Sequence, residues 1–201
     1  MNRIGIYGGS FDPIHLGHLL LAEAAREELR LDQVIFVPAL QSPLKDHPPL
    51  VRNEDRLELV KLAIADNPFF TVSAVELERK PPSYTVDTLL YFHRVYPGRE
   101  FFLLMGQDAL NTLPAWRNFP ALFTLACVTV GLRPGFSPAW PPELEKYRIP
   151  SEESKGLVFF HNPQVEISSS QIRERLHSGK SVRYWLTPAV LDYILRKKLY
   201  I

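Results

Sequence analysis

The stretch Gly8-Gly9-Ser10-Phe11-Asp12-Pro13-Ile14-His15-Leu16-Gly17-His18 decides the fold of this chain. It follows a short apolar run, Ile4 to Tyr7, which is typical of a buried strand. It leads into a segment, Gly17 to Leu29, whose apolar residues recur at helical spacing. Glycines at such a junction let the backbone approach a ligand closely. Because a helix N-terminus offers unpaired N–H groups and a partial positive charge, the junction predicts a phosphate-binding site.

Two histidines stand where this helix begins. His15 and His18 are three residues apart, so both imidazoles can reach the same polyphosphate. Asp12 before Pro13 suits a turn. A glycine turn with two partly exposed histidines is the structural alternative, and a zinc site is another because histidine binds zinc. Zinc would need further cysteine or acidic ligands at suitable spacing, so we predict no metal held by the protein itself.

Strands and helices alternate along the rest of the chain. We predict further strands at 34–37, 71–75, 101–105, 126–130 and 157–160, and further helices at 53–65, 85–96, 171–177 and from 188 onward. Asn53 is expected to cap its helix, Ser168 with Gln171 fits a capping box, and Thr187-Pro188 suits a helix start. This alternation favours an α/β fold: a Rossmann-like doubly wound parallel sheet with helices on both faces.

Length and composition narrow the classes of protein. The 201 residues suit one domain spanning 1–201. With 23 basic and 22 acidic residues the net charge is +1, which disfavours bulk binding to nucleic acid or a membrane surface. No apolar run approaches the roughly 20 residues that span a bilayer, and the N-terminus does not resemble a signal peptide, so we expect a cytoplasmic protein. Cys127, the single cysteine, is expected to pack in the core. The sequence is compatible with a homo-oligomer.

A second motif, Ile167-Ser168-Ser169-Ser170-Gln171-Ile172-Arg173, precedes the helix near the C-terminus. The serines can supply hydroxyl and backbone donors at the helix start, and Arg173 adds a fork of donors suited to phosphate oxygens. Simple helix capping, with Arg173 on a solvated face, is the alternative. Arg175 is expected to face solvent.

Taken together, the two motifs resemble the signatures of the HxGH nucleotidylyltransferase superfamily. Gly9 to Pro13 with His15-Leu16-Gly17-His18 is similar to the first signature, and Ile167 to Arg173 is similar to the second, ISSSxxR. The resemblance implies a nucleotidylyltransferase-type domain in which the C-terminal helices, about 168–201, complete an ATP site. Mg²⁺ would be carried by the ATP. The implied ATP-binding residues, of which His15, His18 and Arg173 would be catalytic, are Gly8, Gly9, Ser10, Phe11, His15, His18, Ser168, Ser169 and Arg173.

Three middle segments narrow the resemblance to bacterial nicotinate-nucleotide adenylyltransferases. They are Pro82 to Thr88, Met105 to Leu110 with Trp116 further on, and Leu132 to Gly135, and the likeness extends from Ile4 to about Leu199. It implies transfer of AMP from ATP to nicotinate mononucleotide, giving nicotinate adenine dinucleotide and pyrophosphate in NAD biosynthesis. The implied substrate-binding residues are Lys45, Tyr84, Thr85, Gly106, Asp108, Trp116 and Arg133.

The resemblance also suggests individual roles. Backbone N–H groups near Tyr84 and Thr85 would hold the pyridine carboxylate, because a helix start favours anions. Trp116 would stack on the cationic pyridine ring. Asp108 would bind a ribose hydroxyl or help to order metal-bound phosphates, and Lys45 and Arg133 would contact phosphate from loops.

Other functions stay open at this point. A sister adenylyltransferase acting on nicotinamide mononucleotide or phosphopantetheine would share both terminal motifs. A cytidylyltransferase fits the middle segments less well, and a nucleotide sensor without activity would be expected to lose a histidine or the arginine. Two departures from the family pattern, the Gln41 to Lys45 loop and Arg117 after Trp116, leave the loop contacts open.

Overall fold

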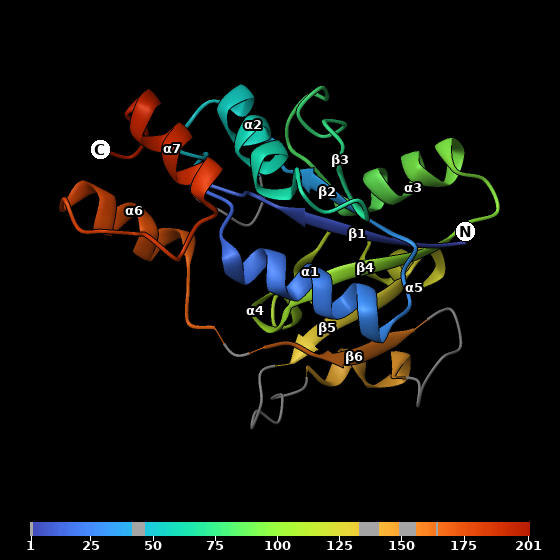
Figure 1. The fold of residues 1–201 in the computed structure, drawn as a ribbon. Helices are drawn as coiled ribbons and strands as arrows, with labels where there is room; N and C mark the ends of the chain where they lie inside the picture. The colour runs from blue at the N-terminus through green and yellow to red at the C-terminus, as the bar shows by residue number, and fades with distance from the viewer. Residues whose placement is uncertain (1, 42–46, 133–140, 149–155, 164) are drawn as a thin grey trace.

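A six-stranded parallel sheet organises the computed structural model, which describes all residues except 1, 42–46, 133–140, 149–155 and 164 (Figure 1). The strand order is β3-β2-β1-β4-β5-β6, and every neighbouring pair is parallel. This confirms the predicted Rossmann-like sheet. The strands are β1 (Arg3–Gly9), β2 (Gln33–Pro38), β3 (Phe70–Val72), β4 (Glu100–Gly106), β5 (Cys127–Leu132) and β6 (Leu157–His161).

Helices cover both faces of this sheet, as expected for a doubly wound fold. They are α1 (Leu16–Glu28), α2 (Asn53–Ile64), α3 (Thr85–Val95), α4 (Gln107–Leu110), α5 (Phe119–Leu125), α6 (Ser169–His177) and α7 (Pro188–Lys197), with 3₁₀ turns at Leu113–Ala115 and Pro142–Tyr147. In Figure 1, α6 and α7 lie together at one end of the molecule, away from α3.

Two hydrophobic cores form because successive strand residues point to opposite faces. On one face, Phe102 and Leu104 of β4 pack in a core that also contains buried residues of α1, α2, α6 and α7. On the other face, Leu103 and Met105 pack with residues of α3, α4 and α5. Cys127 is buried in the first core, and burial raises the pKa of its thiol to about 11, which confirms a packing role.

Some local predictions were wrong. Asn53 does not cap α2: Arg52 holds the N-cap position, and the Asn53 side chain accepts a hydrogen bond from Arg56 instead (2.6 Å). The strand predicted at 71–75 ends at Val72, because the Ser73 hydroxyl accepts from the Val75 N–H and starts a turn. Helices α4 and α5 were not predicted. No helix in the described part of the chain is both long and apolar enough to span a membrane.

Candidate active site

Two cavities open where the strand order reverses, beyond the carboxyl ends of β1 and β4. Parallel sheets bind ligands at this switch point. The larger cavity has a volume of about 850 Å³ and the smaller about 430 Å³. Five residues at or after the ends of β1 and β4 line both cavities: Tyr7, Ser10, His18, Gly106 and Asp108.

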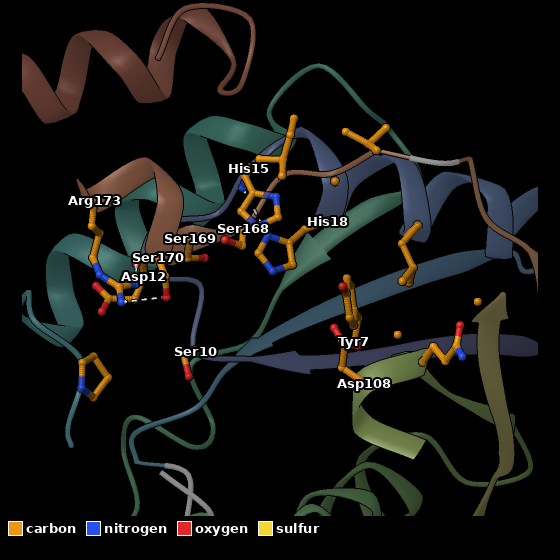
Figure 2. A pocket seen from close by; sticks show the side chains of 18 of the residues that line it. Tyr7, Ser10, Asp12, His15, His18, Asp108, Ser168, Ser169, Ser170 and Arg173 are labelled. Carbon is orange, nitrogen blue, oxygen red and sulfur yellow. Dashed lines mark hydrogen bonds between the residues drawn. The ribbon is translucent and has the colours of Figure 1, made fainter. Parts of the chain in front are cut away.

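The two histidines of the first motif lie against each other at the wall of the larger cavity. Their ring centroids are 3.7 Å apart, and Figure 2 shows His18 on the side facing Ser10 and Tyr7. His15 is the N-cap residue of α1, and its ring packs closely against Gly17: a Cβ at that position would lie 3.1 Å from the ring and push it aside. The glycine of the histidine motif therefore permits the stacked pair.

Burial and hydrogen bonding determine the protonation of the pair. His15 is 7% exposed, and burial lowers the pKa of its imidazole to about 4, so the ring is neutral at pH 7. Its Nδ1 atom is buried without a hydrogen-bond partner among the described residues, which adds to the cost of protonating the ring. Nδ1 of His18 accepts from the His15 backbone N–H (3.2 Å), so a neutral His18 carries its proton on Nε2.

The second motif is bound directly to the first. Ser168 caps α6 through the predicted box with Gln171, whose side-chain oxygen accepts from the Ser168 N–H (3.0 Å). The Ser169 hydroxyl donates to the Pro13 carbonyl (2.9 Å), and Arg173 donates to the Asp12 carbonyl (2.8 Å). Arg173 also donates to the Ser170 hydroxyl (3.2 Å; Figure 2). Residues more than 150 positions apart are thereby joined, and Ser168, Ser169 and Arg173 all line the larger cavity.

Arg175 is half-buried at the surface and lines neither cavity, in keeping with the expectation that it lies away from the site, but its side chain is held by contacts of its own. It donates twice to the Ser181 carbonyl (2.9 and 2.8 Å), and its guanidinium carbon lies 4.9 Å from the centroid of the Trp185 ring. These contacts fix the segment between α6 and α7.

The smaller cavity is lined by the start of α3 and by aromatic side chains. Tyr84 is the N-cap residue of α3, and Thr85 and Thr88 follow it on the cavity wall. Trp116 lines the same cavity, and its indole N–H donates to the Thr112 hydroxyl (3.3 Å). Arg117 lies with its guanidinium carbon 4.4 Å from the centroid of the Tyr84 ring. The cavity thus combines a helix N-terminus with an indole, which suits a flat ring bearing an anionic group.

Some predicted site residues lie elsewhere than expected. Gly8 and Gly9 line the smaller cavity rather than the larger one. Phe11 is 1% exposed and lies in the core, where its ring packs edge-on against His18 at 5.1 Å. It supports the histidine from behind. Lys45 and Arg133 fall outside the described residues.

Two buried charged residues were missed by sequence reasoning. Glu76 is 6% exposed, lines the smaller cavity and accepts from the Thr88 hydroxyl (2.7 Å); burial raises the pKa of its carboxyl. Arg56 is fully buried and donates to the Ser10 carbonyl (2.7 Å), which ties α2 to the glycine-rich loop. No local motif marks either residue, because both act through residues distant in sequence.

Comparison with known proteins agrees with this geometry. Residues 6–175 match the model of the cytidylyltransferase-like family, a span that includes both motifs. The chain is 43% identical over 201 residues to a probable nicotinate-nucleotide adenylyltransferase of Herpetosiphon aurantiacus, with all of both chains covered. It is 45% identical to one of Thermus thermophilus, covering 98% of this chain and 99% of the relative.

Solved structures share the fold at lower sequence identity. The nicotinic acid mononucleotide adenylyltransferase of Plasmodium falciparum, complexed with NaAD, superposes with a TM-score of 0.76 at 21% identity and covers 100% and 98% of the two chains. The same enzyme complexed with APC gives a TM-score of 0.75. Full-length sequence similarity and a shared fold lead to one conclusion: the chain belongs to the cytidylyltransferase-like family and, within it, to the nicotinate-nucleotide adenylyltransferases.

Proposed function

We propose that this protein transfers AMP from ATP to nicotinate mononucleotide, releasing pyrophosphate and forming nicotinate adenine dinucleotide. The observation that carries this is the junction of the two cavities. A triphosphate nucleotide fits the larger one and a pyridine mononucleotide the smaller one, and they meet at His18, Ser10 and Asp108. The relatives named for this reaction, at more than 40% identity over their full length, support the same assignment.

The reaction is an in-line displacement at phosphorus. A phosphate oxygen of nicotinate mononucleotide forms a new bond to the α-phosphorus of ATP, and the bond from that phosphorus to the bridging oxygen of the β-phosphate breaks. The electron pair of that bond leaves with pyrophosphate. Because the attacking oxygen is already ionised, the protein supplies positioning and charge stabilisation rather than a nucleophile.

The motif residues are suited to stabilise the transferred phosphate. In our proposal the Nε2–H of His18, beside both cavities, donates to the α-phosphate. His15 offers a neutral imidazole to the triphosphate. Arg173, held by the Asp12 carbonyl, directs its remaining N–H groups toward the leaving pyrophosphate. Ser168, Ser169 and the N-terminus of α6 add further donors.

In this arrangement Mg²⁺ would bind to the phosphate oxygens of ATP rather than to a site built by the protein. When bound, it neutralises phosphate charge while retaining several water ligands. Asp108, whose carboxylate-bearing side chain lines both cavities, is placed to accept hydrogen bonds from such waters or from a ribose hydroxyl.

The smaller cavity favours an acid over an amide on the pyridine ring. The N-terminus of α3, with Tyr84 and Thr85, presents N–H donors and a partial positive charge, which a carboxylate satisfies better than a carboxamide. Trp116 provides the face on which the pyridine ring stacks.

The proposal is tested by identifying the products. The protein, ATP, Mg²⁺ and nicotinate mononucleotide should yield nicotinate adenine dinucleotide and pyrophosphate in equal amounts, resolved by chromatography and mass spectrometry. Release of phosphate or of ADP in place of pyrophosphate would contradict the proposed bond cleavage. Failure to form any product would favour a nucleotide-sensing role.

A further inference from the structure

Asp12 is the point at which distant parts of the chain meet. Asp12 is 6% exposed, and its carboxylate accepts two hydrogen bonds, from the Tyr200 hydroxyl (2.7 Å) and from the Leu50 backbone N–H (2.9 Å). Its carbonyl accepts from Arg173 (2.8 Å). Both oxygens of the carboxylate and the carbonyl therefore have fixed partners.

Tyr200 reaches this position because the chain folds back after α7. Lys198, the C-cap residue, has a φ of +54°, and Tyr200 itself has a φ of +64°. Such left-handed conformations are unfavourable for side chains larger than glycine, so a compensating contact must hold them. The ring of Tyr200 also packs against the core that contains α1, α2 and α6. Tyr200 thus packs on the core and hydrogen-bonds to the first motif.

The position of Asp12 matters for charge as well as for shape. Asp12 lines the larger cavity, where a carboxylate turned inward would repel a triphosphate. The Tyr200 and Leu50 donors hold its oxygens in place. The cationic side chains of Arg56 and Arg173 lie close enough to interact electrostatically with the Tyr200 hydroxyl. Losing one donor would free this buried anion to turn toward the phosphates.

We propose that Tyr200 is a positioning residue for ATP: through Asp12 it holds the first motif and Arg173 in the arrangement that accepts the triphosphate. Tyr200 lies beyond the residues 6–175 that match the family model. This inference rests on the proposed assignment of the larger cavity to ATP and adds a role for the carboxyl end of the chain.

A matched control exists in the same C-terminal segment. The Tyr193 hydroxyl also donates to an aspartate, Asp55 of α2 (2.9 Å), but Asp55 lines neither cavity. Tyr193→Phe and Tyr200→Phe each remove one hydroxyl-to-carboxylate hydrogen bond between the C-terminal segment and the rest of the domain. Only Tyr200→Phe removes a hydrogen bond to a residue of the first motif, Asp12.

The test measures the Kd for ATP by calorimetry in the absence of nicotinate mononucleotide. It also measures the KM for each substrate from the rate of pyrophosphate release. We expect Tyr200→Phe to raise the Kd and KM for ATP about tenfold, with the KM for nicotinate mononucleotide within twofold. Tyr193→Phe should leave all three within twofold, with a smaller decrease in Tm because its hydrogen bond lies nearer the surface. Circular dichroism checks that both variants are folded.

Two results would overturn the proposal. One is an unchanged Kd for ATP in Tyr200→Phe, and the other is an equal loss of ATP affinity in Tyr193→Phe, which would indicate general destabilisation. The binding measurement needs no turnover, so its outcome is separate from that of the proposed reaction. A wild-type protein that binds ATP but forms no product would contradict the reaction alone.

Discussion

In the proposed reaction His18 is the residue on which the chemistry should depend most, because it lines both cavities and has one ring nitrogen fixed by the His15 N–H. If the proposal holds, replacing His18 by alanine removes a donor to the charge that develops in the transition state. We predict that His18→Ala lowers kcat by roughly 10²- to 10³-fold, a loss of about 2.7–4 kcal/mol, with little change in the KM for ATP.

Steady-state pyrophosphate release checks this, with His177→Ala as the control. His177 is exposed at the end of α6 and lines neither cavity. A near-normal kcat in His18→Ala would refute the role given to His18.

Sequence reasoning identified residues at this scale only where a local motif marked them. His18, Ser168 and Trp116 lie at the cavities because strand ends and helix starts converge at the switch point of the sheet. Glu76 and Arg56 could not be identified, since the fold both buries them and brings them to their hydrogen-bond partners, Thr88 and Ser10.

Helix α7 carries Tyr193, and Tyr200 follows shortly after its end, so this helix positions both tyrosines against the rest of the domain. Its N-cap residue, Thr187, accepts from the Val190 N–H (3.4 Å), and Pro188 follows at the first helical position. We predict that Thr187→Ala lowers the free energy of unfolding by about 1 kcal/mol, because one helix N–H loses its acceptor. Urea unfolding measures this. Thr187→Ser keeps the hydroxyl and should stay near wild type; equal losses in the two variants would instead indicate a packing effect of the methyl group.

Local signals explain which elements could be predicted. The Ser168 box and the Thr187 cap depend on residues within four positions, and both predictions were confirmed. The prediction for Asn53 was wrong because a tertiary partner, Arg56, competes for its side chain. Helix α5 was missed because its apolar residues continue into β5 without a break in composition.

At the scale of the whole molecule, the buried His15 makes stability depend on pH. Its pKa is about 4 in the fold against 6.5 for the ordinary imidazole, so the unfolded chain binds more protons between these values. Stability therefore falls as the pH falls from 6.5 toward 4. The raised pKa of Glu76 acts in the opposite direction, because protonating that buried carboxyl relieves a cost.

A comparison with His15→Gln isolates the histidine, since Glu76 is common to both proteins. We predict that the stability of wild type relative to this variant decreases by about 2 kcal/mol between pH 7 and pH 5. Chemical denaturation at the two pH values checks it. A difference independent of pH would mean that His15 is not held neutral by burial.

The molecule as a whole joins two distant parts of its chain at the larger cavity, and in the proposed function the neighbouring smaller cavity selects the acceptor. The most direct test compares kcat/KM for pyrophosphate release with nicotinate mononucleotide, nicotinamide mononucleotide and phosphopantetheine, at fixed ATP and Mg²⁺. Because the N-terminus of α3 and Trp116 suit an acidic pyridine, we predict at least a roughly tenfold preference for the nicotinate substrate, which corresponds to about 1.4 kcal/mol. Equal or greater activity with either of the other acceptors would contradict the assignment of the smaller cavity.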